Sequence, residues 1–108
     1  MIVTTTETVE GKKVGRYLGL VHGETIYGMN IIKDFFASIT DVIGGRAGVY
    51  EDGLRKARDN ALSEMEGNAV KLGADGIIGL KYDAEVISFA QGGHMLIYTV
   101  TGTAVKLS

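Results

Sequence analysis

The feature that most constrains this chain is a stretch with helical periodicity from Tyr50 to Gly73. Apolar side chains recur there every three or four residues, which places them on one face of a helix; they are Leu54, Ala57, Ala61, Met65, Ala69 and Leu72. Lys71 in the last turn suits the helix dipole, and Gly73 stands where a left-handed residue commonly ends a helix. Other parts of the chain must therefore cover this apolar stripe.

Length and composition predict one globular domain spanning residues 1–108, with 45% hydrophobic and 22% charged residues. The formal net charge is −2, and no run of Lys and Arg gives the basic surface that nucleic-acid binding requires. We therefore expect no nucleic-acid partner.

The chain has no cysteine, which excludes disulfides, thiolate nucleophiles and cysteine-based metal sites. Its first residues lack the basic and apolar regions of a secretory signal, and no apolar run is long enough to span a membrane. These features predict a cytoplasmic protein without a membrane partner.

Four segments have the composition of β-strands: Ile2–Thr6, Val14–Tyr27, Ile77–Phe89 and His94–Leu107. In the second segment, Gly15, Gly19 and Gly23 recur on one face, which predicts that a helix or another backbone lies close to that face. The third segment alternates apolar and charged residues, as a half-buried antiparallel strand does. Its expected apolar face consists of Ile78, Leu80, Tyr82, Ala84 and Val86.

Residues 29–43 have apolar side chains at helical spacing and predict a second, shorter helix. The expected fold class is α+β, with an antiparallel sheet of three to four strands packed against one long and one shorter helix.

Both faces of His94–Leu107 are apolar or rich in threonine. One face is expected on the helices, and a second copy of the chain is the simplest cover for the other.

Several motifs together resemble the YbjQ-like family, small bacterial and archaeal proteins of unestablished function. The resemblance runs nearly from end to end, and its most specific part is Asp34-Phe35-Phe36-Ala37-Ser38-Ile39, Gly44-Gly45-Arg46 and Tyr50-Glu51. It implies a dodecin-subunit-like α+β subunit that assembles into a homopentameric ring. It also implies a label of heavy-metal binding, although soft metals select thiolates and this chain has no cysteine.

Three residues are candidate metal ligands: His22 and Glu24, which share a strand face, and His94, which opens the last strand. A divalent ion such as Zn²⁺ accepts imidazole and carboxylate ligands, and neighbouring subunits are an expected source of the remaining ligands. The alternative is a partly exposed histidine satisfied by its neighbours beside a solvated acidic strand face.

A glycine-rich segment before the long helix is a candidate anion site, made of Gly44, Gly45, Arg46 and Gly48. Free N–H groups and a guanidinium are what a phosphate or carboxylate needs. The alternative is a turn that requires glycine, with Arg46 paired to a carboxylate. The candidate interface residues are Phe35, Phe36, Arg46 and Tyr50, because aromatic anchors are typical of subunit contacts.

No serine stands in a nucleophile-elbow context, and the chain has two histidines and no cysteine, so no catalytic residues are expected. The sequence therefore predicts a non-enzymatic homo-oligomeric domain, expected to be pentameric, that binds a small ligand or metal ion at subunit junctions. The alternative is a structural or interaction protein whose role is the assembly itself.

Overall fold

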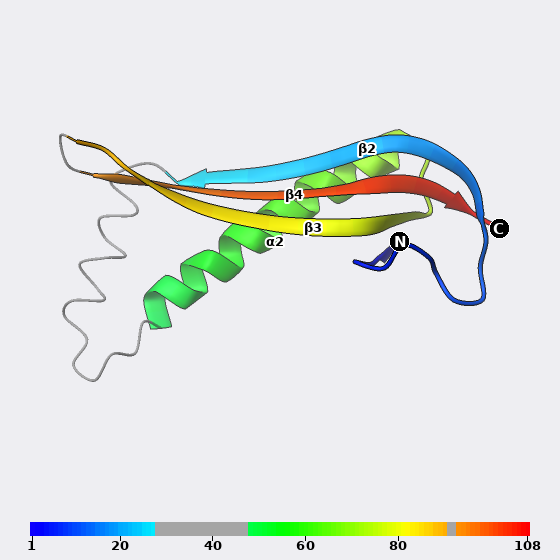
Figure 1. Ribbon diagram of the computed structural model, residues 1–108, viewed down its shortest axis with the longest axis horizontal. Coiled ribbons are helices and arrows are strands. Elements are labelled where there is room, and N and C mark those ends of the chain that lie inside the picture. Colours follow the sequence, from blue (N-terminus) through cyan, green and yellow to red (C-terminus); the bar gives the residue numbers. More distant parts are fainter. Residues whose placement is uncertain (28–47, 91–92) are drawn as a thin grey trace.

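The structure is a computed structural model that describes residues 1–27, 48–90 and 93–108, with side chains in the helix described from Gly53 onward. Its elements, in chain order, are β1 (Ile2–Val3), β2 (Val14–Tyr27), α2 (Gly48–Lys71), β3 (Gly76–Ser88) and β4 (His94–Leu107). The three long strands lie side by side in a sheet, and α2 crosses one of its faces (Figure 1). The shorter helix expected at residues 29–43 falls outside the described residues.

The four-stranded sheet has the order β1-β3-β4-β2. β2 and β3 are antiparallel to β4, whereas β1 is parallel to β3. The sheet is therefore mixed, and the prediction of a wholly antiparallel sheet was wrong. Because β1 and β3 are far apart in sequence, no tight turn imposes an antiparallel direction on this pair.

The boundaries of the long elements agree closely with those that the residue pattern predicts, whereas the first strand, predicted over Ile2–Thr6, ends at Val3. β2 and β4 have the predicted bounds, and β3 begins and ends one residue earlier than expected. The helix begins at Gly48 rather than Tyr50, and Gly73 follows it with a φ of 82°, as expected for a left-handed helix end.

The core lies between α2 and the sheet. Ala57, Ala61, Met65 and Ala69 have no exposed surface. They pack on apolar side chains from all three long strands, namely Val21, Ile77, Leu80, Leu96, Val100 and Ala104. The apolar stripe was thus predicted correctly except at Leu72, which is 47% exposed because α2 ends at Lys71 and the chain turns away there.

β2 approaches the helix backbone very closely at Gly23. A Cβ atom placed on Gly23 would overlap the carbonyl of Ala61 and lie 2.8 Å from the backbone nitrogen of Met65. The predicted close approach is confirmed at this glycine. At Gly19 it was wrong, because Gly19 has open space around it and a φ of 129° beside a register shift of β2.

A second bulge changes which residues of β3 share a face. The register of β3 with β4 shifts between Ile78 and Lys81, where Gly79 has a φ of 63°. The extra residue moves Ile78 to the face opposite Leu80, so the prediction that these two share a face was wrong.

Asp75 ties the beginning of β3 to the end of β4. Its carboxylate accepts hydrogen bonds from the backbone N–H of Leu107 at 3.1 Å and from Nζ of Lys106 at 3.3 Å. The Leu107 N–H first, and then Lys106, hold the pKa of Asp75 below the 3.8 of a free aspartate.

Candidate functional site on the open face of the sheet

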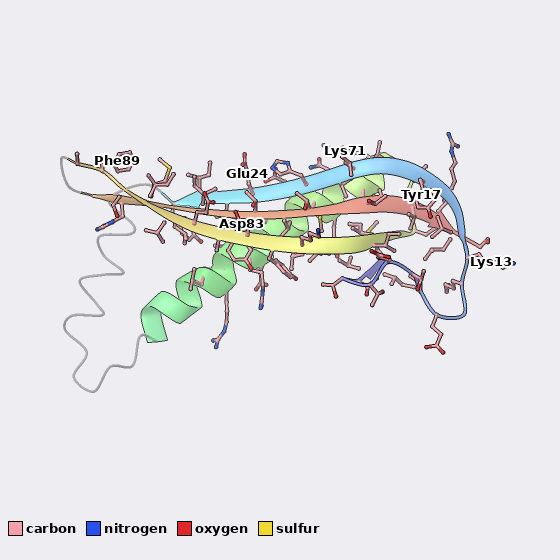
Figure 2. The ribbon with its side chains drawn as sticks, viewed as in Figure 1. Lys13, Tyr17, Glu24, Lys71, Asp83 and Phe89 are labelled. Carbon is pink, nitrogen blue, oxygen red and sulfur yellow. The ribbon has the colours of Figure 1, made fainter. Side chains whose placement is uncertain are left out.

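The sheet face opposite α2, which we call the open face, carries most of the charged strand residues. Strand periodicity and register place three rows of side chains across this face. Each row contains one side chain from each of the three long strands. The rows are His22–Thr101–Lys81, Glu24–Thr99–Asp83 and Ile26–Ile97–Glu85. Figure 2 shows Glu24 on β2 and Asp83 on β3, with β4 between the two strands.

His22 and Glu24 form a pair on this face. Nε2 of His22 lies 3.7 Å from Oε2 of Glu24, and both side chains are about half exposed, at 51% and 44%. The backbone carbonyl of His22 accepts a hydrogen bond of 3.0 Å from the side-chain amide of Asn68, which ties β2 to the helix at this position. The two predicted ligands are therefore adjacent and accessible.

His94 lies elsewhere. It pairs with Ser88, whereas His22 pairs with Thr101, seven positions further along β4. At about 3.4 Å per residue this separates the two histidines by roughly 24 Å along the sheet, and strand alternation places His94 on the helix side. Within one chain, the structure does not bring the three predicted metal ligands together.

The ring of His94 is engaged locally, since its Nδ1 lies 2.9 Å from the hydroxyl oxygen of Ser88. Among the described residues, no three His, Asp or Glu side chains are grouped so that they could hold a metal ion. Together with the absence of cysteine, this donor set does not fit a heavy-metal centre within one chain.

Apolar side chains are also exposed on the open face. Leu20 is 87% exposed and Ile26 is 53% exposed, both on β2. Among the described residues, the buried side chains of this face are Ile78 and Val105, at the end where the N-terminal segment lies (Figure 1). On β4 itself, this face has half-buried side chains at Met95, Ile97, Thr99 and Thr103 and an exposed one at Thr101. The expected cover by a second copy of the chain remains a prediction.

The helix side of the sheet is also incompletely covered. Tyr82 and Val86 of β3 remain 46% and 43% exposed, because α2 packs chiefly over β2 and β4. The ring of Tyr82 meets Tyr98 edge-on at 6.0 Å. Burial, and then the neighbouring Tyr82, raises the pKa of Tyr98 above 10.0.

Two groups of predicted residues lie outside the described residues. They are the candidate anion-site residues Gly44, Gly45 and Arg46 and the candidate interface residues Phe35 and Phe36. Gly48 is the first residue of α2, and Tyr50 lies in its first turn. These assignments remain predictions.

Sequence reasoning did not single out the threonines of β4 or Lys81, which share the rows of His22 and Glu24. Strand parity alone identifies them once the register is known.

In the described residues, a mixed four-stranded sheet with one helix packed on it defines a small α+β domain. The family model described as "Putative heavy-metal-binding" matches residues 1–108, and the chain therefore belongs to this YbjQ-like family.

A solved structure from Pediococcus pentosaceus, a protein of unknown function of the DUF74 family, has a similar fold. The TM-score is 0.70 at 21% sequence identity, over 100% of this chain and 98% of the other. Within the described residues, no helix is long and apolar enough to cross a membrane.

Proposed function

We propose that this chain is a non-enzymatic, cytoplasmic subunit of a homo-oligomeric ring, and that the open face lies at the junctions between copies. The observation that carries this proposal is the exposure of Leu20 and Ile26 on a face that α2 does not cover. Exposed apolar side chains grouped with polar neighbours are typical of protein–protein contacts.

The dimensions of the subunit support the same conclusion. In the part of the chain that the structure describes, one helix, about 10 Å wide, covers only part of three strands that are spaced about 4.8 Å apart and are up to 14 residues long. The radius of gyration is 17.1 Å, against roughly 13 Å for a compact domain of this length. A second layer from neighbouring copies would bury the surface that this extended shape leaves exposed.

A ring also offers a reason for the pair of His22 and Glu24. Two ligands from one chain are too few for a metal centre, but copies that meet at the open face would add ligands of the same kind. We propose that the junctions hold a divalent ion or another small ligand at this pair. The alternative role, in which the assembly itself is the product, requires no ligand there.

Light scattering coupled to size-exclusion chromatography tests the assembly. A pentamer has about five times the 11.5 kDa mass of one chain, and this mass is the expected result. A mass of one chain at every concentration would refute the proposal.

A pair of variants tests the position of the contact. Leu20→Lys places a charge on the open face and is expected to lower the mass, because burying an unpaired ammonium is unfavourable. Val70→Lys is the matched control on α2, where Val70 is 64% exposed, and it is expected to keep the full mass. The reverse result would place the contact on the helix side.

A further inference from the structure

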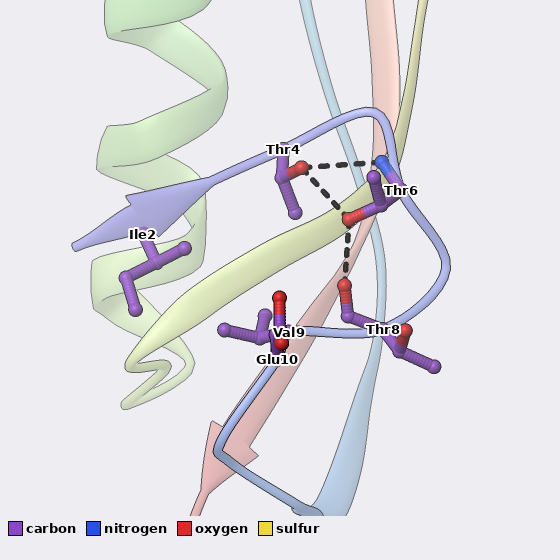
Figure 3. A pocket seen from close by; sticks show the side chains of 6 residues that line it. All are labelled: Ile2, Thr4, Thr6, Thr8, Val9 and Glu10. Carbon is purple, nitrogen blue, oxygen red and sulfur yellow. Dashed lines mark hydrogen bonds between the residues drawn. The ribbon is translucent and has the colours of Figure 1, made fainter.

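A hollow of about 380 Å³ lies inside the loop that residues 2–10 make beside the start of β3 (Figure 3). Its lining comes from one segment and consists of Ile2, Thr4, Thr6, Thr8, Val9 and Glu10. None of these residues belongs to the candidate sites on the open face. The volume is within the range of small-molecule pockets.

Hydrogen bonds within the loop determine which polar groups remain for a ligand. The hydroxyl of Thr6 donates to the carbonyl of Thr8 at 2.6 Å. The single proton of Thr6 is thereby used, so in the 2.9 Å contact between the hydroxyls of Thr4 and Thr6 it is Thr4 that donates. The backbone N–H of Thr6 is also used, because it donates to the hydroxyl oxygen of Thr4 at 3.2 Å.

The hydroxyl oxygens of Thr4 and Thr6 and the carbonyl of Thr8 can therefore only accept a hydrogen bond from a ligand. Glu10 also lines the hollow, and its carboxylate is an acceptor group that carries a negative charge. In the described part of the chain, no ion pair neutralises Glu10. Ile2 and Val9 provide apolar wall next to these oxygens.

We propose that this hollow binds the ammonium group of an aliphatic primary amine. An ammonium has three donors and one positive charge, which match several acceptor oxygens and a single carboxylate. The hydrocarbon chain of the amine would pack on Ile2 and Val9. A divalent cation fits less well, because hard divalent ions are usually bound by more than one carboxylate or carbonyl ligand in a closely fitted shell.

The same chemistry occurs in free small amines and in the side chain of a lysine from a second copy of this chain. Both sources present an alkylammonium to Glu10. The two sources differ in whether binding depends on the concentration of an added amine or on the assembly of the protein.

Amide NMR of the full chain, titrated with butylammonium chloride, tests the proposal. The expected result is saturable movement of the resonances of residues 2–10. Butanol has nearly the same hydrocarbon chain without the charge, and butyrate has the opposite charge; neither is expected to bind. Equal binding of butanol or butyrate would overturn the proposal. So would the absence of saturable movement with butylammonium both in the wild-type chain as prepared and after its dilution to monomers.

Glu10→Gln is expected to weaken butylammonium binding by about tenfold or more, because a charge-assisted hydrogen bond is lost. Glu7→Gln is the matched control in the same loop and does not line the hollow.

If lysine from a second copy is the occupant, Glu10→Gln also lowers the mass measured by light scattering. An unchanged mass assigns the site to free amines. Unaltered affinity in Glu10→Gln would contradict the role of the carboxylate.

Discussion

The Cα atom of Gly23 on β2 faces the backbone of α2 at Ala61 with no room for a side chain between them. Gly23→Ala is therefore expected to destabilise the protein, by about 1–3 kcal/mol or more, because the strand and helix must separate to admit a methyl group. Urea unfolding followed by circular dichroism measures this change.

Gly67→Ala is the control for that substitution. Gly67 lies within α2 with open space around its Cα, so alanine should stabilise the helix by about 0.5–1 kcal/mol. A similar loss of stability in both variants would show that close packing is not what requires glycine at position 23.

The hydroxyl of Thr25 donates a hydrogen bond of 2.8 Å to the carbonyl of Ala57 across the strand–helix contact. Thr25→Val retains the shape and the strand propensity but leaves that carbonyl without this donor, so we expect a loss of about 1 kcal/mol. Thr5→Val in the exposed N-terminal segment is the control and is expected to change the free energy of unfolding little. Equal effects would rule out a specific contribution from the Thr25 bond.

Asp75 predicts an acid-dependent loss of stability. Its folded-state pKa is below 3.8, so the ionised carboxylate favours the folded chain, and its contribution is fully present above about pH 4. The contribution disappears as the pH falls through the lower folded-state pKa.

Asp75→Asn is therefore expected to reduce stability at neutral pH and to flatten the pH dependence below pH 4. Urea midpoints measured from acidic to neutral pH check this expectation. Glu7→Gln serves as an exposed-carboxylate control. A wild-type profile retained in Asp75→Asn would mean that other groups govern acid unfolding.

Metal binding at the junctions predicts a thermal shift that depends on His22. A divalent ion that binds the folded assembly raises the melting temperature, and the rise grows with the logarithm of the ion concentration above the dissociation constant. His22→Ala should abolish the rise, whereas His94→Ala should retain it, since His94 lies on the other side of the sheet. If none of Zn²⁺, Ni²⁺ and Cu²⁺ raises the melting temperature, the metal form of the proposal is wrong.

Much of the candidate site follows from local pattern. The positions of His22 and Glu24 on one face of β2 were predictable, since alternate residues of a strand point the same way. Their partners in the same rows were not, because Thr101, Lys81 and Asp83 come from strands whose register no local pattern specifies. The prediction also grouped His94 with His22 as metal ligands, because the sequence does not specify the register that separates them.

The sequence by itself determined the long helix, three long strands and the small apolar stripe, because hydrophobic periodicity within each segment specifies these features. Tertiary structure decided the parallel pairing of β1, the bulges at Gly19 and Gly79 and which sheet face stays open. Pairing direction depends on contacts between distant segments, and one extra residue in a strand exchanges its two faces without changing composition.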